Sequence, residues 1–321
     1  MLNKSQFKTI LSTYPIGEYK EHKYLEDVFE NDVYILKTTK GKYILKVLRN
    51  IKVGDMKEQL ELIDFLYSKG LPVVKNIKDR KGREISKHGG KWLLIQGFVE
   101  GTCEQDFDKK LVKNIAGHVG KMHKILLKSK FGVQRKKDHV YKKRNLSSIK
   151  KHGLDKIQNE LFKELNERID RSKLKKARIH SDLTNVNLLI KDNKLNAIID
   201  WDDSDYDYLV YEIAIFLAHS CVRGKQIHRG KIKIFMKEYQ KHVKLNEEEK
   251  KAIYFLMKYR LFGILNWYLK YIKSHSERKE MLERGIKRSV RRILKFEKVG
   301  VEDFLEKCFY IFFNFNRYGR I

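Results

Sequence analysis

The chain has 321 residues, of which 70 are Lys or Arg and 41 are Asp or Glu, so its formal net charge is +29. Hydrophobic residues make up 42% of the chain, which is enough for a substantial core and excludes a disordered protein. Only 2 prolines occur, and no Gly/Ser-rich linker or internal repeat is present, which favours one large domain or two closely joined lobes.

Three features of the sequence indicate the cellular compartment in which the protein is expected. The N-terminal stretch MLNKSQFKTILSTYP lacks the apolar core of a signal peptide. The most apolar long segment begins at Ala252 and carries Lys258, Arg260 and Lys270, which indicates a buried helix and not a membrane span. The three cysteines are widely scattered and form no CxxC pair, as is typical of reduced thiols. We therefore expect a cytoplasmic protein with no membrane span.

The first hundred residues are predicted to be rich in strands. The apolar or alternating runs EHKYLEDVF, VYILKTT and KYILKVL are joined by the turns ENDV and TKGK, a pattern that predicts a three-stranded antiparallel meander. A helix is predicted over residues 55–68, and Gly70 ends it. Two further strands are predicted over residues 73–77 and 91–98.

After Gly101 the hydrophobic periodicity becomes helical. Predicted helices cover residues 112–129, 154–169, 209–222, 231–243, 247–272, 278–298 and 301–313. One β-rich piece, NLLIKDNKLNAIIDW at 187–201, predicts a hairpin with Asp192 and Asn193 in its turn. The sequence thus predicts an α+β fold, with a small antiparallel β-rich lobe over residues 1–100 and a larger helical lobe over residues 101–321.

Three polar residues around the predicted hairpin indicate a site. Asp182 and Asn187 are five positions apart, and Asp200 follows Asn187 by 13 positions, at the other end of the hairpin. Because a hairpin returns to its origin, we expect Asn187 and Asp200 to lie close together. Asn and Asp oxygens suit a hard cation such as Mg²⁺, and a nearby carboxylate that is not a ligand can accept a proton from a hydroxyl group. This set is typical of phosphoryl transfer.

The other half of such a site is expected to be a lysine on the β-rich lobe. Lys46 lies among apolar neighbours in the predicted strand YILKV. A lysine buried in a strand needs an anionic partner, and both ATP phosphates and a helix carboxylate meet that need. Glu58 and Glu61 lie on the following helix; we favour Glu58 as the partner and leave Glu61 as the alternative.

These motifs resemble those of the aminoglycoside phosphotransferase-like kinases. His180, Asp182 and Asn187 fit the H-x-D-x-x-x-x-N motif, and IIDW at 198–201 fits the I-D-[FW] motif. The stretches TTKGKYILKV, GGKWLLIQGFVEG, IAGHVGKMH and YEIAIF are similar to further family segments, so the resemblance extends to about residue 220. The superfamily also contains choline kinases, type II homoserine kinases, methylthioribose kinases and CotS-like spore-coat proteins.

The chain departs from the family pattern at several positions. Ser181 stands where Gly is usual, Thr184 and Asn185 stand where His and Pro are usual, and Glu212 replaces Asp. The first turn, at residues 30–33, lacks the glycines that would let a loop close on phosphates.

The resemblance implies a bilobal protein-kinase-like fold, with a nucleotide-binding lobe over residues 1–100 and a catalytic and substrate lobe over residues 101–321. It implies that Asp182 orients and deprotonates the acceptor hydroxyl and that Asn187 and Asp200 hold Mg²⁺. The implied nucleotide-binding residues are Lys46 at the phosphates, with Glu58 as its favoured partner, and the backbone of Gln96 to Phe98 at adenine. His180 would brace the catalytic loop, whereas Asp202, Asp203 and Asp205 would line the acceptor side. His123 is expected only to pack.

The function that the resemblance implies is ATP- and Mg²⁺-dependent phosphoryl transfer to a hydroxyl group of a small molecule. One alternative is a catalytically weak kinase-fold protein with a structural or interaction role, as in the CotS-like group. Another is nucleic-acid binding, but the basic stretches are separate and fit solvated helix faces, and an AT-rich genome also produces many lysines. The positive charge favours a zwitterionic or neutral acceptor over a polycationic aminoglycoside. No feature indicates an oligomeric state.

Overall fold

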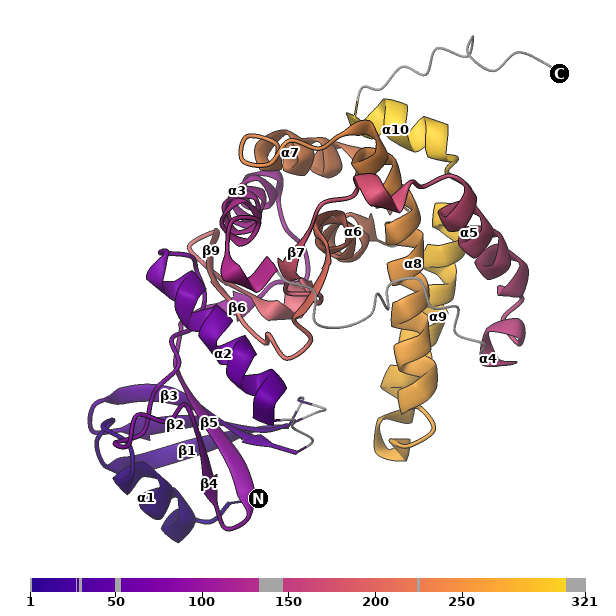
Figure 1. Cartoon of the computed structure of the whole chain (residues 1–321). Coiled ribbons are helices and arrows are strands. Elements are labelled where there is room, and N and C mark those ends of the chain that lie inside the picture. Colours follow the sequence, from indigo (N-terminus) through magenta and orange to yellow (C-terminus); the bar gives the residue numbers. More distant parts are fainter. Residues whose placement is uncertain are drawn as a thin grey trace, which may run out of the picture. The chain divides into compact units, whose positions relative to one another are not determined.

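The computed structural model describes residues 2–26, 28, 31–49, 53–132, 147–223 and 226–309 (Figure 1). The chain forms two compact units. The first consists of Met1–Cys103 and Leu188–Asp202, and the second of Glu104–Asn187 and Asp203–Ile321. Within the described ranges, no helix combines the length and the apolar character needed to cross a bilayer.

A five-stranded antiparallel sheet forms the main part of the first unit (Figure 1). Its strands are β1 (Tyr19–Leu25), β2 (Asp32–Thr38), β3 (Gly41–Leu48), β4 (Ile85–His88) and β5 (Lys91–Gly97), in the order β1-β2-β3-β5-β4. Gly41 has φ 141° in the tight turn that joins β2 to β3, a conformation that glycine adopts without strain. The predicted meander is confirmed as β1-β2-β3.

Helix α1 (Lys4–Ser12), for which the sequence analysis assigned no element, covers one face of this sheet. Asn3 caps it: its side chain accepts the Gln6 amide, and the Gln6 side chain accepts the Asn3 amide in return. Phe7, Ile10 and Leu11 of the helix are buried in one cluster with residues of β2, β3 and β5. A short amphipathic segment therefore becomes a helix because the sheet gives its apolar side a surface to cover.

Strand β3 places Lys46 on the opposite face. Leu45 and Val47 are buried in the cluster under α1, and successive side chains of a strand alternate between faces, so Lys46 points away from α1. Its cross-strand neighbours are the buried Val33 on β2 and Leu94 on β5. Helix α2 (Val53–Ser68) follows β3 and matches the helix predicted over residues 55–68.

The predicted hairpin is present as β8 (Leu188–Lys191) and β9 (Lys194–Ile198), and β6 (Thr102–Cys103) pairs with its outer side. Its turn residues Asp192 and Asn193 have φ 52° and 55°, as a two-residue turn of this kind requires. The hairpin belongs to the first unit because Ile198 also donates its amide to Pro72 O at 2.7 Å. The structural division therefore differs from a simple split at residue 100.

The predicted strand over residues 73–77 is wrong. Val73 and Asn76 form only isolated bridges, to Ile198 and Gln96 respectively, and the regular edge partner of β5 is β4, which was not predicted. Residues 73–77 are held between the hairpin and β5, so the side chains of Val73 and Val74 are buried without a continuous ladder.

The second unit is mainly helical (Figure 1). Its helices are α3 (Lys109–Leu126), α4 (Ser147–Lys150), α5 (Asp155–Glu167), α6 (Leu209–Ser220), α7 (Arg229–Tyr239), α8 (Glu247–Tyr271), α9 (Lys279–Glu297) and α10 (Val301–Phe309). Short 3-10 turns lie at Lys130–Gly132, Arg171–Lys173, Asn185–Asn187 and Ser276–Arg278. The strands are β7 (Lys176–Ile179), β10 (Asp205–Tyr208), β11 (Val222–Arg223) and β12 (Gln226–Ile227). The predicted helices are confirmed, although the part of the last one beyond residue 309 lies outside the described residues.

Helix α6 is the central element of this unit, since nearly all of its side chains are buried. Helices α8 and α9 pack together at a point where Gly285 faces Tyr268. A Cβ atom at Gly285 would lie 2.2 Å from the ring of Tyr268, so the close approach of the two helices requires glycine there.

Candidate active site

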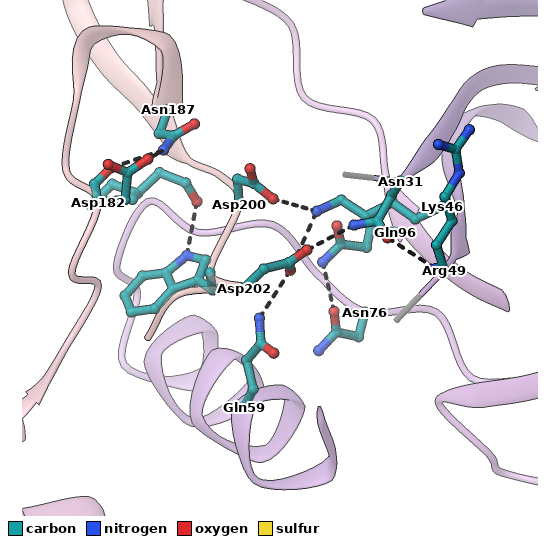
Figure 2. Close-up of polar contacts among 12 residues, drawn as sticks. Asn31, Lys46, Arg49, Gln59, Asn76, Gln96, Asp182, Asn187, Asp200 and Asp202 are labelled. Atoms are coloured by element: carbon teal, nitrogen blue, oxygen red, sulfur yellow. Dashed lines mark hydrogen bonds and ion pairs between the residues drawn. The ribbon is translucent and has the colours of Figure 1, made fainter. Parts of the chain in front are cut away.

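Lys46 of β3 forms the centre of a polar group in the first unit (Figure 2). Its Nζ lies 2.7 Å from Asp200 Oδ1 and 3.6 Å from Asp202 Oδ1. The Lys46 side chain is only 11% exposed. Burial disfavours the ammonium ion, but the carboxylates of Asp202 and Asp200 outweigh that cost, and the pKa of Lys46 is raised. The expected anionic environment of this lysine is therefore present.

The partner expected on helix α2 is not the one observed. Within the described ranges, the carboxylates in ion-pair contact with Lys46 are Asp200 and Asp202, and neither Glu58 nor Glu61 takes that place. Glu61 is exposed, and the polar side chain that α2 buries is Gln59. The helix phase explains the difference, because the buried side of α2 runs through Met56, Gln59, Leu60 and Ile63.

Asp200 and Asp202 follow β9 and are positioned by the local backbone and by amide side chains. Asp200 has φ 62°, a left-handed conformation that is uncommon for a residue with a side chain. Asp202 accepts hydrogen bonds from Asn31 Nδ2 at 3.0 Å and from Gln59 Nε2 at 3.2 Å (Figure 2). Asp202, which the resemblance implied for the acceptor side, thus belongs to the polar group of Lys46. Strained backbone of this kind is often found at functional sites.

The residues expected to contact adenine lie at the end of β5. Gln96 is buried, and its Nε2 donates to Asn76 Oδ1 at 2.9 Å (Figure 2). The amide of Gly97 donates to Lys75 O at 2.8 Å, which fixes the chain where it leaves the strand. The Phe98 ring follows, with Lys42 Nζ 5.5 Å from its centroid.

Asp182 forms the centre of a second polar group, in the second unit. Asn187 Nδ2 donates to both the backbone oxygen and the Oδ2 atom of Asp182, each at 2.8 Å (Figure 2). Arg260 Nη2 of α8 contacts Asp182 Oδ1 in an ion pair. The Asp182 side chain remains 26% exposed, so a ligand can reach a carboxylate that is already held in place.

The loop between β7 and β8 holds Asp182 through buried contacts. His180 is fully buried, and its Nδ1 accepts the Asp182 amide at 3.2 Å. Ser181, where the resemblance implied Gly, has φ 66°, and its amide donates to Glu212 Oε2 at 2.9 Å. The hydroxyl groups of Ser181 and Thr184 are buried and have no hydrogen-bond partner among the described residues. Such unpaired groups leave hydrogen-bonding capacity on both sides of Asp182.

Glu212 connects this loop to the core of the unit. The carboxylate of Glu212 also accepts from His123 Nε2 at 3.1 Å, and His123 Nδ1 lies 2.9 Å from the Tyr239 hydroxyl. All three side chains are fully buried. Burial, together with the nearby Glu249 and Glu212 carboxylates, raises the pKa of Tyr239 well above its usual value, so the hydroxyl stays protonated and can donate to His123. His123 is thus a packing residue with both nitrogens satisfied, as expected.

Arg260 was not predicted as a site residue. Its Nε lies 3.3 Å from His219 Nε2, and burial of the guanidinium is outweighed by the Asp182 carboxylate, so the pKa of Arg260 is raised. Burial, with Arg260 and further arginines nearby, holds the pKa of His219 well below its usual value, so His219 is neutral and can accept from Arg260. The available signal was a charged residue inside the most apolar segment of the chain, which implies a buried partner.

The contacts of Asn187 and Asp200 leave oxygen atoms that suit the expected Mg²⁺ ion. Asn187 uses its amide nitrogen on Asp182, which leaves its Oδ1 as the atom suited to a cation. Asp200 offers a side chain that is 49% exposed. Within the described ranges, no three His, Cys, Asp or Glu side chains gather as a ready metal cluster. One amide and one carboxylate fit Mg²⁺, because this ion is usually completed by water and substrate phosphates.

The chain is similar to known proteins in sequence. The profile of a family described as a phosphotransferase enzyme family matches residues 21–231, which is more than half of the chain. A homoserine kinase from Bradyrhizobium diazoefficiens is 26% identical over 272 residues, which cover 80% of this chain and 83% of that protein. A homoserine kinase from Granulibacter bethesdensis is 25% identical over 279 residues, which cover 80% of this chain and 84% of that protein.

Solved structures show the same fold. A microcompartment-associated aminopropanol kinase superposes with a TM-score of 0.73 at 16% identity, covering 95% of this chain and 100% of that one. The choline kinase LicA from Streptococcus pneumoniae superposes with a TM-score of 0.63 at 20% identity, covering 92% of this chain and 99% of that one. These matches confirm the expected kinase-like fold, with an antiparallel β-rich part and a larger helical part.

Proposed function

Since the chain belongs to the phosphotransferase enzyme family, we propose that it transfers the γ-phosphoryl group of ATP to a hydroxyl group of a small molecule, in a reaction that requires Mg²⁺. The observation that carries the proposal is the ion pair between the largely buried Lys46 and the partly exposed Asp200, with 2.7 Å between Nζ and Oδ1. A lysine held charged in a strand and paired with a carboxylate is suited to triphosphate and its metal ion. The homoserine kinase relatives and the kinase neighbours support this assignment.

Asp182 is the proposed catalytic base. The acceptor oxygen forms a bond to the γ-phosphorus, the bond from that phosphorus to the β,γ-bridging oxygen breaks, and ADP leaves with the electron pair. The hydroxyl proton passes to the Asp182 carboxylate. Asn187 and Arg260 support this role, since they fix both carboxylate oxygens while the side chain stays partly exposed. Positioning of this kind supplies much of the rate enhancement in phosphoryl transfer.

Asn187 and Asp200 are the proposed holders of Mg²⁺, which would neutralise charge on the phosphate oxygens when bound. The pairing of Leu188 with Ile198 supports this, because Asn187 directly precedes the first strand of the hairpin and Asp200 closely follows the second.

The nucleotide contacts are assigned to the first unit. Lys46 would contact the phosphates, and the backbone from Gln96 to Phe98 would bind adenine. Because Lys46 is paired with Asp200 and Asp202, Glu58 is not assigned as its partner in this proposal.

We place the reaction in the cytoplasm. Within the described ranges, Cys103, Cys221 and Cys308 form no disulfide, which supports a reducing compartment.

The test is thermal unfolding with ATP, with and without Mg²⁺, on the wild type and Asp200→Ala. Nucleotide at 100 times its dissociation constant should stabilise the wild type by ~2.7 kcal/mol. The stabilisation should need Mg²⁺ and should be lost in Asp200→Ala. The control is Glu100→Ala, which removes an exposed carboxylate paired with Lys191. If millimolar ATP stabilises neither the wild type nor the control, the enzyme assignment fails, and a structural or interaction role takes its place.

A further inference from the structure

Three arginines, Arg223 of β11, Arg260 of α8 and Arg292 of α9, gather around the end of helix α6, and we call them the arginine cluster. Arg260 Nε lies 3.3 Å from His219 Nε2. Arg292 Nη2 contacts Ala218 O and lies 3.4 Å from His219 O. The cluster is therefore built from elements far apart in sequence, and through Arg260 it reaches the Asp182 carboxylate.

The cluster is short of negative partners. Arg292 is 9% exposed, and its Nε is buried without a hydrogen-bond acceptor among the described residues. Within the same ranges, its contacts are backbone carbonyls, and no carboxylate forms an ion pair with it. Arg223 lies 3.5 Å from the exposed Asp106, and Arg260 has Asp182. A buried guanidinium with an unused donor is a costly arrangement unless an anion completes it.

The electrostatics agree with this shortage. Burial and the neighbouring Arg223 lower the pKa of Arg292 to about 10, so Arg292 remains charged at neutral pH. The neutral His219 adds no countercharge. An anion that entered here would gain charge-assisted hydrogen bonds to a planar fork of donors, the geometry that suits carboxylates.

We propose that the arginine cluster binds a carboxylate group of the acceptor, so that the acceptor is a small hydroxy acid. The assignment rests on the proposed function, because it takes Asp182 as the base next to the acceptor hydroxyl. The phosphates of ATP are assigned to Lys46 in the first unit, and the cluster is thus available for the other substrate. Homoserine carries a carboxylate, whereas choline and aminopropanol do not, so the proposal selects among the substrates named for the relatives and neighbours.

Arg260 has a double role in this arrangement. Without acceptor it pairs with Asp182 Oδ1. An incoming carboxylate competes for the same guanidinium and releases that oxygen to receive the hydroxyl proton. A neutral or cationic acceptor offers no such replacement and leaves Asp182 paired.

The test is calorimetric titration of the full chain without ATP. The probes are L-homoserine, 4-hydroxybutyrate and glycolate, each compared with its primary amide, together with choline. At least one acid should bind, and its amide should bind about 10- to 100-fold more weakly, the range for hydrogen bonds to a charged group. Arg292→Met should weaken binding of the acid by a similar factor and leave binding of the amide unchanged. Arg291→Met is the matched control, since it removes an exposed arginine from the neighbouring position of α9.

Several results overturn the proposal: no acid binds, an acid and its amide bind equally, or Arg291→Met weakens binding as much as Arg292→Met. If Arg292→Met does not fold, Arg223→Gln, at a side chain that is 29% exposed, provides the second variant and should weaken acid binding severalfold. An acid that binds in this way but is not phosphorylated with ATP and Mg²⁺ confirms the anion site and refutes the proposed function. If the protein phosphorylates choline but binds none of the acids, the proposed function is confirmed and the anion site is refuted.

Discussion

Replacing Glu212 with alanine should destabilise the second unit and loosen the loop that carries Asp182. The carboxylate accepts from His123 Nε2 at 3.1 Å and from the Ser181 amide at 2.9 Å, and it is fully buried. Alanine leaves the buried His123 Nε2 and the partly buried Ser181 amide without a partner, and each unpaired donor costs ~1–3 kcal/mol. The expected loss in free energy of unfolding is therefore about 2–6 kcal/mol, or a fall in Tm of about 4–12 °C for a chain of this length.

Denaturant titration measures the stability loss, and hydrogen exchange over residues 179–188 measures the loop. The stability of Glu212→Gln should lie between that of Glu212→Ala and that of the wild type. The amide oxygen of Gln can accept from only one of the two donors, and it carries no charge. The Ser181 amide should exchange faster in both variants, even where the protein remains folded. Glu167→Ala, an exposed glutamate at the end of α5, is the control and should change stability by less than about 0.5 kcal/mol. A Glu212→Ala protein within 1 kcal/mol of the wild type, with unchanged exchange at Ser181, refutes this reasoning.

Two further outcomes are expected. Gly285→Ala should lower the stability by about 1–3 kcal/mol in a thermal or denaturant titration, because the new Cβ would lie 2.2 Å from the Tyr268 ring; an unchanged Tm would show that α8 and α9 separate easily. Burial raises the pKa of Cys221 and of Cys308 to about 12, and it also raises the pKa of Cys103, whose side chain is nevertheless exposed. At pH 8 iodoacetamide should therefore label Cys103 slowly and reach the other two only after unfolding, as read by mass spectrometry. Labelling of Cys221 in the native protein would contradict its burial.

Short sequence patterns predicted the elements whose conformation depends on neighbouring residues, such as the hairpin and the strand that carries Lys46. The Asp192-Asn193 turn was recognisable because both residues tolerate positive φ, and the flanking apolar runs then defined the hairpin. The apolar neighbours of Lys46 in its strand predicted a buried lysine in need of an anion, and the structure supplies Asp200 and Asp202. The prediction of a strand over residues 73–77 was wrong because an apolar run indicates burial but does not indicate which hydrogen bonds the backbone forms.

The parts of the site that escaped prediction depend on tertiary packing. Choosing between Glu58, Gln59 and Glu61 requires the phase of α2 on the sheet, which a few residues of sequence do not fix. Arg260 and Arg292 lie on two helices for which no motif was recognised, and only the packing of α8 on α6 and of α9 on α8 brings them to His219. The sequence signalled Arg260 only as a charge within an apolar segment.

The assignment of β8 and β9 to the first unit affects how the chain can fold during synthesis. Residues 1–103 leave the ribosome long before residues 188–202, yet β6 has β8 as its partner and Pro72 receives the amide of Ile198. The first unit therefore stays incomplete until the chain has grown by about a hundred residues. Until then, the residues of β6 have no strand to pair with and remain exposed. A gene fragment that ends at residue 103 should for the same reason yield a protein prone to aggregation, whereas a fragment in which residues 188–202 are joined to it by a flexible linker should be soluble.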